Sequence, residues 1–355
     1  MNQENIKIIL EAAIKAPSGE NCQPWKFKIQ GDKILLFNQP EKDLSLYNWN
    51  QSASYIAHGA ALENMSIAAA HYKYELRHTL FPDPLNLNLV ASITLDRKES
   101  TNEIFLFNSI KRRVSNRKVY QSEPLSSEVQ QELMKTTNNT DGIRLVLNTA
   151  DKDIKKLGQV ASIGERIVLE NKSLHSFFFE HINWTKEEDD DKRTGFYVKT
   201  LELPEKDEKG FRMASNWRLL SMLNLLGISK KVAEKNAQVY SSCGAMGIFT
   251  ILDCSPKNFV QVGRLLERLW LKATELNVHV GLMTGVLFLK LRIDNDPNHG
   301  LSKKHVTLVE EYSSQLKNIF HINHGEKPVI LFRLGYGEQP SAQSSRLPLE
   351  YFIET

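Results

Sequence analysis

One stretch of about twenty residues, Ser52 to Tyr72, constrains the fold more than any other part of the chain. It is rich in alanine, and its apolar residues lie on more than one face of the expected helix. A surface helix carries a single apolar stripe, whereas a helix that is apolar all round is buried. We therefore expect this helix to lie in the centre of the molecule, with other elements packed around it.

The same helix is echoed later in the chain. Residues 204 positions further on repeat four of its residues: Gly59, Leu62, Glu63 and Ala69 recur as Gly263, Leu266, Glu267 and Ala273. A strand-like segment follows each helix. Either these identities arose by chance, or the chain contains two copies of one α+β unit. Because the displacement exceeds half of the 355 residues, complete copies would require an insertion between the matched helices.

Hydrophobic periodicity predicts the remaining elements of this α+β chain. The expected helices cover residues 3–16, 103–112, 126–136, 151–171 and 258–277, and the expected strands cover 25–29, 34–37, 75–80, 89–95, 143–147, 247–252, 278–282 and 329–334. Residues 172–235 are expected to be irregular. The charge cluster Lys186–Arg193 within them indicates either a solvated loop or part of a lid inserted over a ligand.

Composition and cysteine content exclude several classes of protein. The chain has 45 Lys and Arg against 42 Asp and Glu, a balance that does not favour a nucleic-acid partner. Its three cysteines, Cys22, Cys243 and Cys254, lack metal-ligand spacing, so no zinc module, other metal site or disulfide scaffold is expected. Because no apolar run reaches about 18 residues and no leader peptide is evident, we expect a cytoplasmic protein without a membrane partner.

The most distinctive motif runs from Pro17 to Trp25 and reads Pro-Ser-Gly-Glu-Asn-Cys-Gln-Pro-Trp. It lies between an expected helix and an expected strand. Ser18, Asn21 and Gln23 offer hydrogen-bonding groups on a loop that two prolines hold in place. Taken alone, the motif is also compatible with a helix stop followed by a turn into a strand.

A second motif contains Arg113, Ser115 and Arg117. Two guanidinium groups with a hydroxyl between them suit a phosphate, because arginine donates paired, charge-assisted hydrogen bonds. The alternative is a basic helix end on the surface.

Two weaker signals lie towards the C-terminus. Arg346 belongs to a Ser-Arg-Leu-Pro sequence, which taken alone is a basic tail peptide. Thr284 and Gly285 follow the expected strand 278–282 and would form a simple turn if they had no further role.

Together these motifs resemble the signature of the nitroreductase superfamily, whose members bind FMN. The first matches Pro-Ser-x-x-Asn-x-Gln-Pro-Trp-x-Phe, the second Arg-x-Ser-x-Arg/Lys and the third a closing Ser-Arg-Leu-Pro. The resemblance implies that FMN is held by Pro17, Ser18, Gly19, Asn21, Gln23, Arg113, Ser115, Arg117, Thr284, Gly285 and Arg346. By the same resemblance, Arg113, Ser115 and Arg346 hold the phosphate and Arg117 faces the pyrimidine edge. Backbone N–H groups at Thr284 and Gly285 face the N5 region of the flavin.

The order of the motifs departs from that of an ordinary nitroreductase, in which the Arg-x-Ser motif precedes the Pro-Ser loop. Here the Pro-Ser loop comes about 95 residues earlier. This arrangement resembles the Acg-like branch of the superfamily and implies a fused pseudo-dimer. We expect a truncated half at about 1–100 and a second half at 101–355 with a lid insertion at about 172–235. One flavin site would be assembled per chain.

The function that the resemblance implies is electron transfer from NAD(P)H through FMN to a nitroaromatic, a quinone or a similar small acceptor. No catalytic side chain is expected, because the flavin carries the chemistry. The alternative is a protein that stores or sequesters FMN with little or no turnover. The chain would act as a monomeric pseudo-dimer, and further dimerisation stays open.

Overall fold

The computed structural model describes residues 3–98, 104–137 and 140–354. Two antiparallel sheets share one strand order. The first has the order β1 (Trp25–Gln30), β2 (Lys33–Asn38), β4 (Leu89–Arg97) and β3 (Tyr74–Leu80). The second has the order β5 (Ile143–Asn148), β8 (Ala245–Ile251), β10 (Lys327–Gly335) and β9 (His279–Leu282). In both sheets the fourth strand along the chain lies between the second and the third. The α+β prediction with two fused copies is therefore confirmed.

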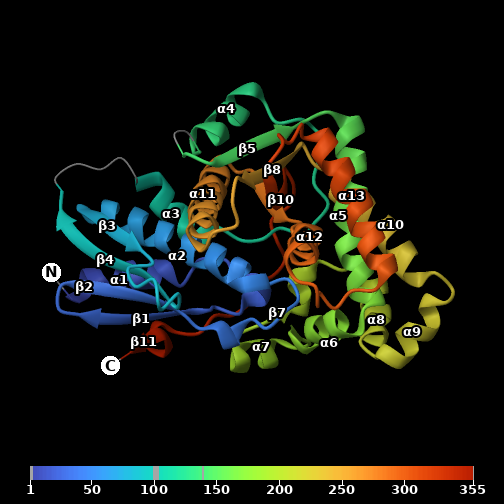
Figure 1. Ribbon diagram of the computed structural model, residues 1–355, viewed down its shortest axis with the longest axis horizontal. Coiled ribbons are helices and arrows are strands. Elements are labelled where there is room, and N and C mark those ends of the chain that lie inside the picture. The colour runs from blue at the N-terminus through green and yellow to red at the C-terminus, as the bar shows by residue number, and fades with distance from the viewer. Residues whose placement is uncertain (1–2, 99–103, 138–139, 355) are drawn as a thin grey trace.

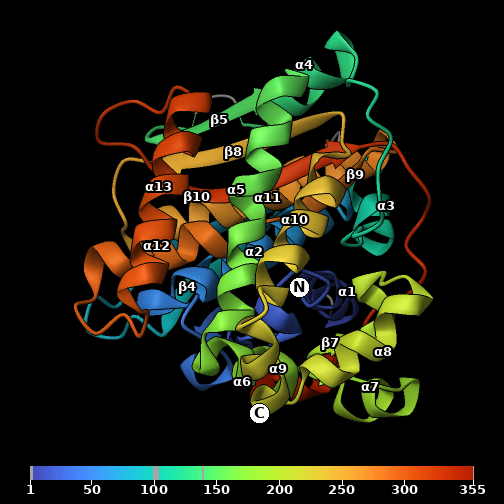
Figure 2. The same cartoon turned by 90° about the vertical axis from the view of Figure 1, so that its right-hand side faces the viewer.

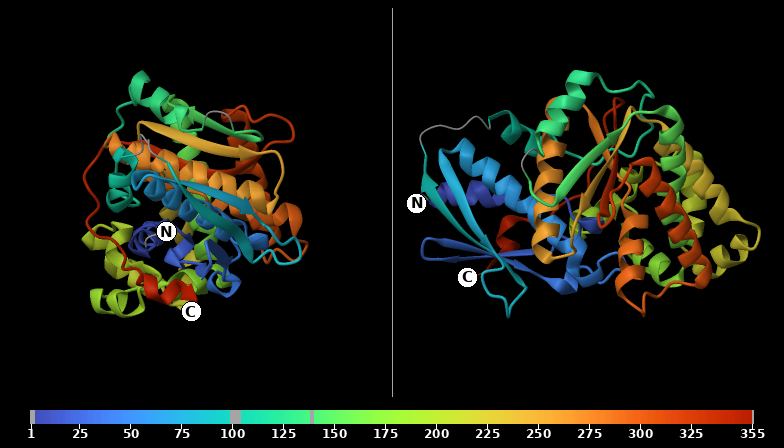
Figure 3. Two further views of the ribbon diagram at one scale, coloured as in Figure 1. Left: turned by 90° about the vertical axis from the view of Figure 1, so that its left-hand side faces the viewer. Right: turned by 45° about the horizontal axis from the view of Figure 1, so that its top comes forward.

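Two long helices, α2 (Ser52–His71) and α11 (Pro256–Glu275), lie between the sheets (Figures 1 and 3). Sixteen of the twenty residues of α2 are buried, which confirms the central position expected from its all-round apolar surface. Each helix occupies the same place in its copy, between the second and third strands. The echoed sequence therefore marks two equivalent, mutually packed elements.

The backbones of α2 and α11 approach one another at two equivalent glycines. A Cβ atom on Gly59 would lie 1.9 Å from the carbonyl oxygen of Val260, and one on Gly263 would lie 1.9 Å from that of Ile56. Gly59 and Gly263 are 204 positions apart, as are Ile56 and Val260, so the crossing has the symmetry of a two-fold axis. Only glycine allows the two backbones to approach this closely, which explains why both helices have a glycine at the equivalent position.

The insertion that the echo requires lies between β5 and β8. Strands β1 and β2 are joined by two residues, whereas residues 149–244 separate β5 from β8. This segment contains α5 (Asp151–Glu170), α6 (Lys172–Glu180), α7 (Lys186–Lys192), α8 (Glu205–Ala214), α9 (Trp217–Asn224) and α10 (Ile228–Ser241). The prediction of irregular structure over 172–235 is therefore wrong, and Lys186–Arg193 is mostly a helix rather than a loop.

Side-chain caps explain why these short helices form. Asn171, Thr185 and Asn216 each accept a hydrogen bond from a backbone N–H in the first turn of α6, α7 and α9. The acidic first turn of α7 also suits the positive end of its helix dipole. A small apolar cluster around Phe179 and Leu220 then packs the helices together.

The C-terminal tail returns to the first sheet. Its strand β11 (Ile353–Glu354) pairs in parallel with β1, and the buried Phe352 ring lies 6.1 Å from that of Trp25. The chain therefore closes across both copies. The expected boundary near residue 100 falls in 99–103, outside the described residues, and stays a prediction.

The remaining helices are α1 (Gln3–Ala13), α3 (Ile104–Arg112), α4 (Ser127–Lys135), α12 (Gly285–Asn295) and α13 (Lys303–Ile319), and two short strands, β6 (Ile182–Asn183) and β7 (Phe196–Tyr197), pair beside α7. Among the described residues, no helix is long and apolar enough to cross a membrane.

Replacing Gly263 by alanine is expected to destabilise the protein by about 3 kcal/mol or more, because the new methyl group overlaps the carbonyl of Ile56. The measurement is the free energy of unfolding in urea. Gly210→Ala is the matched control, since open space surrounds that position in α8. It is expected to be neutral or stabilising by up to about 1 kcal/mol. Equal effects of the two substitutions would contradict this account of the crossing.

Candidate functional site

The Pro17–Trp25 loop connects α1 to β1, and its central side chain is Gln23. The Gln23 amide is fully buried. Its Nε2 donates to the carbonyl of Arg193 at 2.7 Å, and its Oε1 accepts from the backbone N–H of Leu347 at 3.1 Å. Its own backbone N–H donates to Ser18 Oγ at 3.0 Å. One glutamine therefore joins this loop to the C-terminal tail and to the residue that follows α7.

The backbone of the loop is strained. Glu20, Asn21 and Gln23 have φ of 43°, 54° and 52°, in the left-handed region that non-glycine residues rarely adopt. Asn21 Nδ2 donates to the carbonyl of Ser345 at 2.9 Å, while Gly19 is exposed. Strain of this kind persists only where the surrounding contacts hold it, and it clusters at functional sites.

Arg113 and Arg346 lie together at the C-terminal end of α1. Arg113 Nη2 donates to the carbonyl of Lys15 at 2.6 Å, and Arg346 Nη1 donates to that of Ile14 at 3.0 Å. Arg113 Nε also lies 3.0 Å from a carboxylate oxygen of Glu267, and both of these side chains are buried. Burial and the neighbouring charge of Arg113 lower the pKa of Arg346 to about 9. Two guanidinium groups thus face a single carboxylate, and an anion would complete the charge balance.

Arg117 and Ser115 lie beyond this pair. Arg117 Nη1 donates to the carbonyl of Thr200 at 3.1 Å, and its guanidinium lies 5.0 Å from the centre of the Phe196 ring. Burial lowers the pKa of Arg117, and interactions with groups that include Tyr240 and Glu20 oppose that shift. Ser115 is half-buried. The second motif therefore reaches both the Pro-Ser loop and the 172–235 segment.

Thr284 and Gly285 begin α12. The first N–H groups of a helix have no partner within it, so this turn presents donors to its surroundings. A Cβ atom on Gly285 would lie 3.6 Å from Tyr47 Cε1, and one on Gly164 would lie 3.6 Å from the Cα of Gly285. The start of α12 is therefore packed between Tyr47 and α5.

Five further polar residues were missed by the sequence analysis as site candidates. They are Glu20, Asp43, Tyr47, Glu165 and Tyr240. Tyr240 Oη donates to Glu165 Oε1 at 2.7 Å, and burial raises the pKa of Glu165. Burial raises the pKa of Tyr47, and the neighbouring Glu165 and Glu20 raise it further. This group, which we call the acidic cluster, connects the Pro-Ser loop with the start of α12. No motif identifies Glu165 or Tyr240, because only the packing of α5 against α10 brings them to this place.

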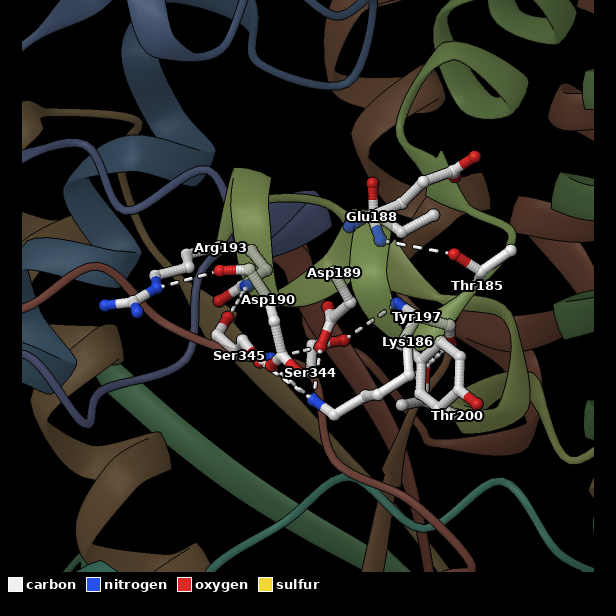
Figure 4. Close-up of polar contacts among 12 residues, drawn as sticks. Thr185, Lys186, Glu188, Asp189, Asp190, Arg193, Tyr197, Thr200, Ser344 and Ser345 are labelled. Carbon is white, nitrogen blue, oxygen red and sulfur yellow. Dashed lines mark hydrogen bonds and ion pairs between the residues drawn. The ribbon is translucent and has the colours of Figure 1, made fainter.

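Helix α7 lies against the C-terminal tail (Figure 4). Ser345 donates through its N–H to Asp189 at 2.9 Å and through its Oγ to Asp190 at 2.7 Å. After α7, the N–H of Tyr197 donates to Ser344 Oγ at 3.0 Å. The 172–235 segment thus contacts the tail, Gln23 and Arg117, and so reaches three of the four motifs.

A cavity lies elsewhere, between α2 and α11. It measures about 560 Å³ and is lined by residues of α2, α3, α4 and α11, among them Glu63, Arg264 and Arg268. None of the predicted cofactor-binding residues lines it. Glu63 already pairs with Arg264 at 3.0 Å and with Arg268. We therefore place the candidate site at Arg113 and Arg346, where the charges are not balanced.

Comparison with known proteins gives distant relatives. No family model matches the chain. An uncharacterised protein of Mycobacterium tuberculosis is 22% identical over 347 residues, which cover 97% of this chain and 47% of that protein. Two M. tuberculosis proteins named as NAD(P)H nitroreductases are each 26% identical. One of them, Acg, matches over 49% of this chain and 53% of its own length. The other matches over 34% of this chain and 36% of its own length. The chain thus spans about half, or less, of the length of the curated relatives it matches.

Solved structures overlap only in part. A nitroreductase with bound FMN from Bacteroides fragilis is 11% identical with a TM-score of 0.35, covering 70% of this chain and 95% of that one. A BluB-like flavoprotein from Clostridium difficile is 14% identical with a TM-score of 0.39, covering 70% and 98%. At these scores the overlap carries no argument about the site.

The acidic cluster makes stability depend on pH. Burial, followed by the charge of Asp43, raises the pKa of Glu20 from 4.5 to about 8. The folded chain therefore holds a proton that the unfolded chain releases above pH 4.5, and this contribution to stability is lost as the pH rises to about 8. Between pH 5 and pH 8 the free energy of unfolding should fall less for Glu20→Gln than for the wild type. The measurement is urea unfolding at each pH. Glu41→Gln, at an exposed position, should behave as the wild type. If the free energy of unfolding of Glu20→Gln changed with pH as steeply as that of the wild type, Glu20 would not be the group that holds the proton.

Proposed function

Because the chain belongs to the nitroreductase superfamily, we propose that it is an FMN-dependent oxidoreductase that passes electrons from NAD(P)H to a small acceptor such as a nitroaromatic compound or a quinone. The names of the M. tuberculosis relatives support this proposal. The observation that carries it is the pair of the buried Arg113 and the half-buried Arg346, which faces a single carboxylate. A phosphate is an anion that such a pair of guanidinium groups binds well, through paired charge-assisted hydrogen bonds.

The donor set fits FMN in this proposal. Arg113 and Arg346 would exchange their backbone carbonyl partners for phosphate oxygens, and Ser115 would add a hydroxyl. Arg117 would face the pyrimidine edge, where a cation stabilises negative charge on the reduced ring. When bound, FMN supplies the hydride chemistry, and the chain binds, orients and shields it.

The 172–235 segment has the role of a lid in this proposal. It contacts Gln23, Arg117 and Ser345, which belong to three different motifs. A segment with these contacts excludes water from the site when it is closed. Donor and acceptor would then enter only when α7 leaves the tail. The 1–100 and 101–355 halves would each contribute to one shared site.

Reduction of the purified flavoprotein tests the proposed activity. Anaerobic NADPH or NADH is expected to bleach the visible flavin absorption, and a quinone added afterwards is expected to restore it. Flavin that stays oxidised with both donors would favour the alternative of FMN storage, which none of the relatives' names describes. Protein that is colourless and takes up no added FMN would refute both functions.

Arg113→Ala and Arg346→Ala are each expected to weaken FMN binding at least tenfold, because each removes a charge-assisted contact worth about 1.5–3 kcal/mol. The measurement is a titration of FMN fluorescence with the apoprotein. Arg112→Ala is the matched control. The Arg112 side chain is exposed and bonds Asn277 instead, so the affinity should not change. Unchanged affinity in both test variants would refute this phosphate site.

A further inference from the structure

The end of α9 exposes three large apolar side chains at the edge of the molecule. Met222, Leu225 and Leu226 are 67%, 88% and 74% exposed. They occupy the last turn of α9 and the turn that leads into α10, a corner at the right-hand edge of Figure 1 and on the side that faces the viewer in Figure 2. We call these three residues the α9 tip.

The orientation of the α9 tip is fixed by contacts on the opposite face of the helix. Leu220 is buried in the small apolar cluster of the 172–235 segment. Asn224 Nδ2 donates to the carbonyl of Leu169, at the end of α5, at 2.6 Å. Because these two side chains hold the inner face of α9, the α9 tip cannot turn inward without breaking them. The helix thus packs one apolar face on the core, while apolar side chains at its C-terminal end stay exposed.

Three exposed cations lie close to the α9 tip in the sequence. Arg218 on α9 and Lys230 and Lys231 on α10 are exposed. Within residues 3–98, 104–137 and 140–354, none of the three forms an ion pair, whereas Lys235 pairs with Asp207. Exposed apolar residues bordered by lysine and arginine are typical of a helix that lies on an anionic lipid surface. Protein interfaces, in contrast, are depleted in lysine.

We propose that the α9 tip docks on the surface of an anionic membrane, with Met222, Leu225 and Leu226 in the interface and Arg218, Lys230 and Lys231 against the lipid phosphates. This contact is peripheral, so it agrees with the lack of a spanning helix among the described residues. It revises the expectation that no membrane takes part, which rested on spanning segments and leader peptides alone. It is independent of the proposed oxidoreductase activity.

Co-sedimentation with lipid vesicles tests the proposal on the full chain. Wild-type protein is expected to bind vesicles of phosphatidylcholine with phosphatidylglycerol, and to bind pure phosphatidylcholine at least tenfold more weakly. The double variant Leu225→Ser, Leu226→Ser is expected to lose at least tenfold in affinity. Lys230→Gln with Lys231→Gln should lose a similar factor and reduce the salt dependence. Leu85→Ser is the matched control, since Leu85 is 96% exposed in the β3–β4 turn, and it should bind as the wild type.

Three outcomes would overturn the proposal. In the first, the wild type binds anionic vesicles no better than the serine double variant does. In the second, Leu85→Ser loses as much affinity as that variant. In the third, the wild type is a dimer on size exclusion and the serine double variant is a monomer. The last would assign the α9 tip to a second copy of the chain. Flavin absorption, recorded on the same samples, reports separately on the cofactor, so failure here leaves the proposed function untouched.

Discussion

The close crossing of α2 and α11 at Gly59 and Gly263 is the constraint on which the rest of the structure depends. Each glycine meets a backbone carbonyl of the other helix, so the helices are in contact along their backbones. That contact fixes the distance between the two sheets and brings Glu267 of α11 to Arg113. The candidate phosphate site is therefore positioned by the same crossing that joins the two copies.

Much of the framework could be predicted from sequence because long, strongly patterned elements report their own burial. The buried α2, its echo in α11 and eight of the nine described strands of the two main sheets are predicted by periodicity, and only the two-residue β11 is not. Helices α6 to α10, α12 and α13 were missed. Of these, α6 to α9 have only seven to ten residues, and α6 and α7 are stabilised by the caps Asn171 and Thr185 and by a small core of their own. Short helices held by local contacts of this kind leave little hydrophobic periodicity in the sequence.

The candidate site shows the same division. The motifs identified Gln23, Arg113 and Arg346, and the structure brings the loop, the arginines and the tail together. Glu165 and Tyr240 could not be predicted, since their meeting depends on how α5 packs against α10. Their roles, like those of the predicted residues, rest on the proposal that an FMN is held there.

The central place of α2 has a consequence for synthesis on the ribosome. α2 emerges about 200 residues before α11, and at roughly 5–20 residues per second this leaves an interval of roughly 10 to 40 s. During that time α1 and the first sheet cover only part of its apolar surface. The face that will receive Gly263 stays open to water, and to any other nascent chain or chaperone that meets it. Because both copies lie in one chain, α2 has to wait during translation for its partner helix. Two separate subunits, each complete when released, would not impose this delay.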